Sequence, residues 1–408
     1  MLFFYGNTPI CKAPFVGIFI DTSGNVTPCC FNREDIFGNI YTQSIKEIWY
    51  SEIALNLRNT LLKKILPKGC IRCQEFINAK NFYNSGIYIY KNFNHKKLTI
   101  QTIDLELSYL CNLNCEMCYL KSKKYELSQE KEEIILKCME LLLPNLKRIR
   151  FLGGEPLYIP IYKKIFNKIL TKKNKYSIHI TTNGTIFEKS LKKISQKNNL
   201  FLTFSIDSLD EYNYKKIRRG AQLQNVINNI KAYKQLKPKH ITIAITPMIL
   251  NVLDIPKLVK YANNNNFSLH FNYLIYPKEL SINNLNIKDL KKIIEILKKN
   301  SFIPKNFRQF FNYLKYYGFI NQVKYALKEK YKKPNYSNNE VNYYALLIYN
   351  FATKKLNNIT NNFNKEIIEQ IIKQKLKELY FHEILNYLNE TNTSKIIDLI
   401  EKELKKTF

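Results

Sequence analysis

The chain has 408 residues, with 64 lysines and arginines against 33 aspartates and glutamates, for a formal charge of +31. A hydrophobic fraction of 45%, a mean hydropathy of −0.31 and the lack of an unbroken apolar run of about 18 residues exclude a polytopic membrane protein. The 13% of aromatic residues exclude a chain that never collapses. The first residues lack the marks of a signal peptide, so a cytoplasmic protein is expected.

The positive charge fits nucleic acid or an acidic partner, and no membrane is expected. Its basic residues are spread along the chain, and AT-rich coding accounts for much of the lysine and asparagine content. Nucleic acid is therefore a partner that the charge allows but does not favour.

The N-terminal residues predict a small module. Residues 15–30 read as a hairpin, because a strand-like run is followed by the turn chemistry of Asp21 to Asn25. Ser44 is an expected N-cap, with Glu47 three residues on, for a helix that reaches about Leu62. We place this module at 1–80 and a linker at 81–100.

Strands that alternate with amphipathic helices begin at residue 101, which is the pattern of a parallel α/β sheet. Helices are predicted at 129–143 and 222–236, and six strand–helix units favour a partial TIM-type (β/α)6 barrel over a closed eightfold one. The predicted strands lie near 103–109, 147–152, 177–182, 200–206, 240–246 and 267–273.

We assign 101–279 to this barrel and 280–408 to a helical C-terminal extension, with one helix expected over 365–389. The extension carries no catalytic motif, and a helical cap that packs on the barrel or on a partner is expected.

Eight of the nine cysteines fall into two groups, and Cys138, on a predicted helix, is expected in the core. In a reducing compartment such groups indicate metal binding or catalysis. The first group, Cys111, Cys115 and Cys118, follows the first barrel strand. Three thiolates ligate three irons of a 4Fe-4S cube and leave the fourth iron open to a small molecule. A structural zinc site normally has four ligands.

A second motif, Gly153-Gly154-Glu155-Pro156, ends the next strand. Glycines allow a close approach of the backbone to a ligand, and a carboxylate can accept hydrogen bonds from an ammonium group.

The CxxxCxxC spacing and this motif resemble those of radical S-adenosylmethionine (radical SAM) enzymes. The resemblance implies that the open iron chelates the amino and carboxylate groups of S-adenosylmethionine, that the Gly-Gly-Glu-Pro turn holds the amino group, and that reduction releases a 5′-deoxyadenosyl radical. The family's aromatic before the third cysteine is Met117 here, with Tyr119 as the nearest aromatic. The resemblance also nominates further cofactor contacts, for which turn or capping roles are equally open: Thr182, Asn183, Ser205, Asp207 and Arg218.

The second group supplies five thiols, of which a fully ligated cube needs four. The arrangement resembles the SPASM/twitch auxiliary-cluster domain, here ahead of the barrel, and a zinc ribbon is the alternative. We expect Cys30 to be the spare thiol and the ligands to be Cys11, Cys29, Cys70 and Cys73.

Among polar residues of the strands, His270 and Glu106 are hypothetical substrate contacts. The resemblance implies a peptide or protein substrate and an electron donor such as flavodoxin or ferredoxin. RNA or a carbohydrate or cyclitol is the alternative substrate. A non-enzymatic iron-sulfur or zinc scaffold is the alternative of another class.

Overall fold

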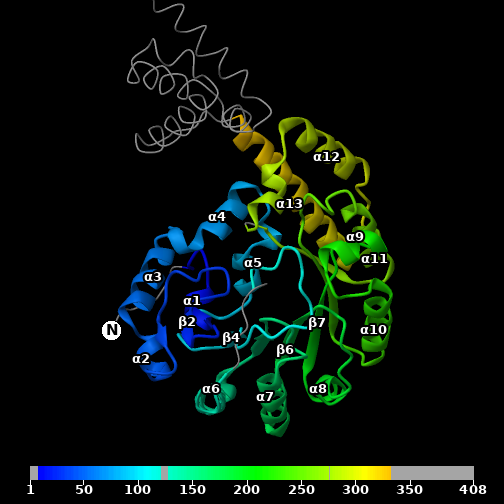
Figure 1. Cartoon of the computed structure of the whole chain (residues 1–408). Helices are drawn as coiled ribbons and strands as arrows, with labels where there is room; N and C mark the ends of the chain where they lie inside the picture. Colours follow the sequence, from blue (N-terminus) through cyan, green and yellow to red (C-terminus); the bar gives the residue numbers. More distant parts are fainter. Residues whose placement is uncertain (1–7, 121–126, 275, 332–408) are drawn as a thin grey trace, which may run out of the picture. The chain divides into compact units, whose positions relative to one another are not determined.

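The computed structural model describes residues 8–120, 127–274 and 276–331. In these residues, strands form one sheet in the order β3-β2-β1-β4-β5-β6-β7-β8-β9 (Figure 1). Neighbouring strands run parallel from β1 across to β9, while β2 and β3 pair antiparallel. The strands are β1 Gly17–Ile20, β2 Asn25–Thr27, β3 Gly38–Asn39, β4 Thr102–Leu105, β5 Arg148–Phe151, β6 Ser177–Thr182, β7 Asn199–Ser205, β8 His240–Ile245 and β9 Ser268–Phe271.

The six predicted barrel strands are confirmed as β4 to β9, and the sheet does not close, as expected for a partial barrel. The predicted helices at 129–143 and 222–236 are α6 and α10. Ser128 caps α6 by accepting a hydrogen bond from the Lys131 backbone N–H. The helices of this region are α6 Gln129–Leu142, α7 Pro160–Thr171, α8 Leu191–Lys197, α9 Glu211–Ile217, α10 Leu223–Gln235 and α11 Ile255–Asn264.

The two faces of the parallel sheet differ in polarity. On β6 the apolar Ile178 and Ile180 are buried, whereas the alternating Ser177, His179 and Thr181 are partly exposed. The same alternation continues on β7. A closed barrel would fill its interior with branched apolar side chains. Here the second face is polar and reached by solvent, which suits it to binding a ligand.

The N-terminal hairpin is part of this sheet. Strands β1 and β2 pair around Asp21, whose side chain accepts hydrogen bonds from the Ser23 and Asn25 backbone N–H groups. Strand β1 also pairs in parallel with β4, with Phe19 opposite Asp104. The hairpin expected within a separate module therefore extends the barrel sheet at its β4 edge.

The helix predicted from Ser44 to Leu62 is interrupted. The Ser44–Glu47 capping box is present, but the segment forms two helices, because Ser51 caps a second one. The expected linker at 81–100 is helical in part and buries Tyr90. The elements are α1 Ala13–Val16, α2 Ile45–Trp49, α3 Glu52–Leu62, η1 Lys68–Cys70, α4 Ile71–Asn78, η2 Phe82–Asn84 and α5 Gly86–Tyr90.

After the barrel come η4 Lys278–Leu280, η5 Ile282–Asn284, α12 Ile287–Lys299 and α13 Phe307–Lys330. The chain divides into two compact units, 1–284 with 293–322 and 285–292 with 323–408. The helix expected at 365–389 lies outside the described residues. None of the described helices is both long and apolar enough to span a bilayer.

The edge strand β9 is covered by side chains of the same unit. Leu269 donates its backbone N–H to Asn312 Oδ1 at 2.8 Å, and its carbonyl accepts from Lys315 Nζ at 2.7 Å. Phe271 donates its backbone N–H to Asn84 Oδ1 at 3.2 Å. Polar side chains thus satisfy backbone groups that an edge strand would leave open.

Candidate active site

Cys111, Cys115 and Cys118 lie in the loop that follows β4, at the C-terminal end of the parallel strands. Backbone hydrogen bonds tie this loop to the end of α9, from Glu116 N to Ile217 O at 2.8 Å and from Asn114 N to Arg219 O at 3.0 Å. The loop is therefore held at two points against a neighbouring βα segment.

The three thiols are close enough to influence one another. Burial raises the pKa of Cys115 to about 11, and the neighbouring Cys118 and Cys111 add to the rise against the opposing charge of Arg218. Burial also raises the pKa of Cys111. Because iron binds thiolates, loading this site must release protons.

Donors surround these sulfur atoms. Leu113 N lies 3.5 Å from Cys111 Sγ, and Asn183 Nδ2 and Arg218 Nη1 lie 3.9 Å from Cys111 Sγ and Cys115 Sγ. N–H donors toward thiolate sulfur are among the factors that set the potential of an iron-sulfur cluster. Three thiols in a loop with such donors fit a 4Fe-4S cube.

Gly153 and Gly154 allow a close approach, but to the protein's own backbone. A Cβ on Gly154 would lie 2.0 Å from Leu110 O, and one on Gly153, whose φ is +113°, would lie 2.5 Å from Ser108 O. Hydrogen bonds from Gly154 N to Ser108 O and from Glu155 N to Leu110 O join the segments. The glycines thus pack the Gly-Gly-Glu-Pro turn against the strand exit that leads into Cys111, and the expected approach to a ligand stays a prediction.

Glu155 is fully buried and already has partners. Its Oε1 accepts from Thr182 Oγ1 at 2.8 Å and from Leu157 N at 3.1 Å, and its Oε2 accepts from Asn183 N at 2.7 Å. Burial raises the pKa of this carboxyl, while the hydrogen bonds to its oxygens oppose the rise. The side chain therefore joins the ends of β5 and β6. Pro156, next in the turn, is also buried.

Thr182 and Asn183 carry the connection to the cysteine loop. The Asn183 Nδ2 group donates to Asn112 Oδ1 at 2.9 Å, one residue after Cys111. The first cysteine loop, the Gly-Gly-Glu-Pro turn and the end of β6 are thus brought together, as the sequence predicted.

Asp207 and Arg218 form a buried ion pair with 2.7 Å between Oδ2 and Nη2. Asp207 Oδ1 also accepts from the Thr246 N–H, so its carboxylate aims Arg218 at Cys115. Burial raises the pKa of Asp207, and the charge of Arg218 counteracts this. Ser205, the last residue of β7, is partly exposed.

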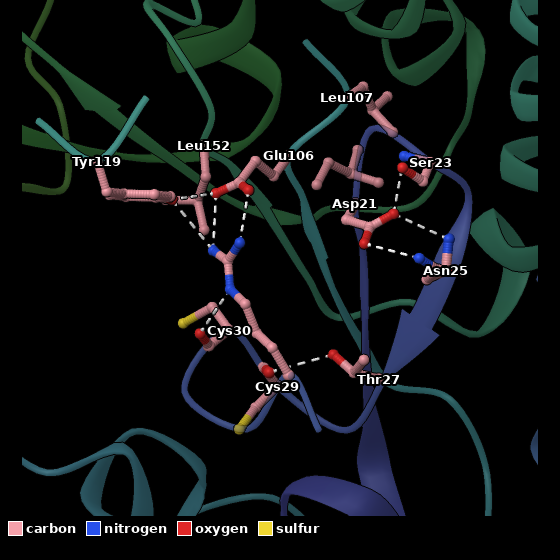
Figure 2. Close-up of polar contacts among 12 residues, drawn as sticks. Asp21, Ser23, Asn25, Thr27, Cys29, Cys30, Glu106, Leu107, Tyr119 and Leu152 are labelled. Atoms are coloured by element: carbon pink, nitrogen blue, oxygen red, sulfur yellow. Dashed lines mark hydrogen bonds and ion pairs between the residues drawn. The ribbon is translucent and has the colours of Figure 1, made fainter. Parts of the chain in front are cut away.

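Tyr119 and Met117 have different surroundings. Met117 packs against a cluster formed by Ile217, Met248 and Leu274. Tyr119 is 56% exposed, yet its hydroxyl donates to Glu106 Oε2 at 2.8 Å, as Figure 2 shows. The ring of Tyr119 is therefore held by its hydroxyl and open over its surface.

Cys11, Cys29, Cys70 and Cys73 lie close enough for their charges to interact, and Cys30 also disfavours the ionised forms of Cys29 and Cys73. Burial raises the pKa of Cys11, and Cys73 and Cys70 raise it further. Burial likewise raises the pKa of Cys29, with contributions from Cys73 and Cys11, and that of Cys70 to about 12. The four thiols predicted as ligands thus come from the segment before α1, the loop after β2, η1 and α4.

Cys30 has another partner. Its Sγ accepts a hydrogen bond from Arg150 Nη2 at 2.9 Å, and Arg150 is in turn ion-paired with buried Asp104. The Tyr90 hydroxyl also donates to Asp104, at 3.1 Å. Cys30 therefore faces the inner side of the barrel, which fits its role as the spare thiol.

No three histidine, cysteine, aspartate or glutamate side chains of the described ranges converge on a single-ion site. The ligands of a 4Fe-4S cube bind separate irons and need no common centre.

Two histidines, His179 and His270, lie near basic side chains. Burial, with Lys315 and Arg150 nearby, lowers the pKa of His270 to about 3. Burial, with Arg148 and Arg150, lowers the pKa of His179. Both histidines are therefore neutral at pH 7, and His270 faces inward as the sequence hypothesis required.

Glu106, the other hypothetical substrate contact, is engaged by a protein side chain. The residue is 2% exposed, and its carboxylate is held by Arg33 through two hydrogen bonds of 2.7 and 2.8 Å. Arg33 was not a candidate, because a single arginine in a loop has no periodic or motif signal. Arg150 was missed for another reason: an inward position on a strand does not reveal that its partner is Cys30.

Family models match two parts of the chain: residues 105–262 match the radical SAM superfamily, and residues 11–74 match SPASM, an iron-sulfur cluster-binding domain. The chain thus contains a radical SAM domain and an iron-sulfur cluster-binding domain, and these two domains imply S-adenosylmethionine and 4Fe-4S clusters as cofactors. The N-terminal match favours an iron-sulfur cluster over a zinc ribbon.

Curated relatives match about two fifths of the chain. A probable GTP 3′,8-cyclase of Methanococcus maripaludis (strain C6) is 29% identical over 40% of this chain and 52% of its own length. A GTP 3′,8-cyclase of Synechocystis sp. is 28% identical over 42% of this chain and 53% of its own. The chain thus spans about half the length of these relatives.

Solved structures resemble it over about half of the chain. A tagged form of anSMEcpe with bound AdoMet is 19% identical and covers 50% of this chain and 58% of that one, with a TM-score of 0.40. Streptococcus suis SuiB bound to S-adenosylmethionine is 18% identical, covers 49% and 47%, and has a TM-score of 0.38.

Proposed function

We propose that this chain binds S-adenosylmethionine at a 4Fe-4S cluster held by Cys111, Cys115 and Cys118 and cleaves it reductively. The observation that carries the proposal is the assembly of this cysteine loop with the Gly-Gly-Glu-Pro turn and the end of β6. When bound and reduced, the cluster supplies the electron that splits the sulfonium and yields the 5′-deoxyadenosyl radical.

The protein's own residues orient the two cofactors. Arg218, aimed by Asp207, lies beside Cys115 and supplies a cation for the carboxylate of S-adenosylmethionine. Glu155 fixes the turn whose backbone lines the site, and Ser205 and Asn183 offer polar groups at neighbouring strand ends. The exposed ring of Tyr119 is suited to contact with the adenine.

Cys11, Cys29, Cys70 and Cys73 hold the auxiliary 4Fe-4S cluster in this proposal. It exchanges electrons with the first cluster or with a substrate intermediate, and a flavodoxin or ferredoxin is the external donor.

For the substrate, a peptide or protein remains our first candidate, and the formal charge of +31 favours an acidic one. A nucleotide is the second candidate, because the curated relatives are named as GTP 3′,8-cyclases. Either would carry negative charge, which suits a basic protein.

The test is anaerobic reconstitution with iron counting and measurement of 5′-deoxyadenosine under dithionite. We expect about eight irons per chain from two cubes. Cys115→Ala should lose about half of the iron and all 5′-deoxyadenosine formation, whereas the control Cys138→Ala, which changes a buried thiol on α6, should retain both. A fully loaded protein that forms no 5′-deoxyadenosine would refute the proposal.

Acidic peptides and GTP, added separately, then discriminate the substrate classes. The true class should raise the rate of 5′-deoxyadenosine formation and appear in a modified product.

A further inference from the structure

Arg33 connects the two cysteine-bearing loops. It lies three residues after Cys30, and its Nε donates to the Cys30 carbonyl at 3.3 Å. Its guanidinium then reaches Glu106, just beyond β4, with Nη1–Oε1 at 2.7 Å and Nη2–Oε2 at 2.8 Å. This two-pronged contact fixes direction as well as distance, which a lysine cannot do.

The same carboxylate holds Tyr119. Glu106 Oε2 accepts from the Tyr119 hydroxyl at 2.8 Å, and Arg33 Nη2 lies 3.2 Å from that hydroxyl (Figure 2). Tyr119 directly follows Cys118. A continuous series of contacts therefore runs from the auxiliary cysteine loop through Arg33 and Glu106 to the end of the first cysteine loop.

The partners in this series differ in exposure. The Glu106 side chain is 3% exposed, and Arg33 and the Tyr119 hydroxyl supply hydrogen bonds to its carboxylate. Tyr119 itself is 56% exposed, and its ring also lies 5.6 Å from the Arg33 guanidinium carbon. A ring that is anchored at its hydroxyl in so exposed a residue can offer the face away from Arg33 as a stacking platform. Met117 cannot take this place, because it packs into the Ile217 cluster.

We infer that Arg33 is a positioning residue for S-adenosylmethionine: through Glu106 it orients the Tyr119 ring beside the first cluster. The inference rests on the proposed function and adds that the auxiliary domain supplies part of the S-adenosylmethionine site. Arg33 touches neither reactant. Its effect passes through Tyr119, so its loss should weaken cofactor binding without removing the cysteine ligands.

The test measures S-adenosylmethionine affinity by anaerobic equilibrium dialysis on the reconstituted protein without reductant, so that no cleavage occurs. Arg33→Met and Tyr119→Phe should each weaken binding about 10-fold, as losses of residues that orient a ligand site commonly do. The double variant should also lose about 10-fold, since both changes break one series. The affinity of Arg33→Lys should lie between those of the wild type and Arg33→Met. The control Lys164→Met, which removes a surface pair with Glu132, should bind as the wild type does.

Hydrogen exchange on the metal-free protein provides a second readout. Arg33→Met should speed exchange of the backbone amides from Glu116 to Tyr119, while iron content after reconstitution stays at about eight per chain. If Arg33→Met fails to fold, Tyr119→Phe at its exposed position still tests the contact.

Two outcomes would overturn this inference and leave the proposed function standing. One is that the variants bind S-adenosylmethionine within twofold of the wild-type affinity, and the other is that the loss in the double variant equals the product of the single losses. A wild type that binds no S-adenosylmethionine would overturn the proposed function and this inference together.

Discussion

Gly154→Ala should separate the Gly-Gly-Glu-Pro turn from the cysteine loop. The added Cβ would lie 2.0 Å from Leu110 O and 2.6 Å from Tyr109 O, both backbone atoms that cannot rotate away. Overpacking of this kind costs about 1–3 kcal/mol. The hydrogen bonds Gly154 N to Ser108 O and Glu155 N to Leu110 O would lengthen, at about 1 kcal/mol each. The free energy of unfolding should therefore fall by about 3–5 kcal/mol.

Urea denaturation of the metal-free protein measures this loss, and iron counting measures its effect on the site. Because Leu110 precedes Cys111, we expect the variant to retain only the auxiliary cluster, about four irons per chain. Gly220→Ala is the control: its φ of +95° costs about 1–2 kcal/mol, but the new Cβ meets its nearest atom at 3.3 Å. If Gly154→Ala were as stable as this control and kept eight irons, the packing argument would be refuted.

Asp207→Asn leaves Arg218 buried without its counter-charge, so the free energy of unfolding should fall by about 3–5 kcal/mol. The double variant Asp207→Asn/Arg218→Met removes the unpaired charge as well, and denaturation should show that it recovers part of this loss. His270 has a folded-state pKa of about 3 against 6.5 unfolded, so its contribution is complete above pH 6.5 and is lost as the pH falls toward 3. Between pH 6 and 4, the free energy of unfolding of His270→Gln should fall less steeply than that of the wild type, by roughly 1 kcal/mol per pH unit. Equal slopes for the two proteins would contradict this. Arg58→Met removes a fully buried guanidinium that donates to Pro14 O and Trp49 O, and denaturation should show a loss of about 2–3 kcal/mol, against none for a surface Lys164→Met.

Local patterns account for what the sequence could predict. The strands β4 to β9 follow from apolar runs between turn residues, and the cysteine groups follow from spacing alone. The outcome for Ser44 and Ser51 shows the limit of such patterns: both are good N-caps, and the helix periodicity that spans them does not reveal that the second starts a new helix.

Pairings over long sequence separation could not be read in the same way. The apolar β1 residues fit a hairpin whether or not they also pair with β4, some 85 residues later. Glu106 was correctly placed on the inner side by strand alternation, but Arg33, its partner, is 73 residues away in a loop without a pattern. Glu155 was likewise located by its motif, while its bonds to Thr182 and Asn183 emerged only from the packing of neighbouring strands.

The cover on β9 has a consequence for association between molecules. The open sheet of a partial barrel has two edge strands. An uncovered parallel edge strand would pair with strands from other chains. Asn84, Asn312 and Lys315 occupy hydrogen-bonding positions of Leu269 and Phe271 that an incoming strand would need. Replacing these three side chains by alanine would turn the β9 edge into a template for strand addition. At this edge, resistance to aggregation therefore depends on two side-chain amides and one ammonium group.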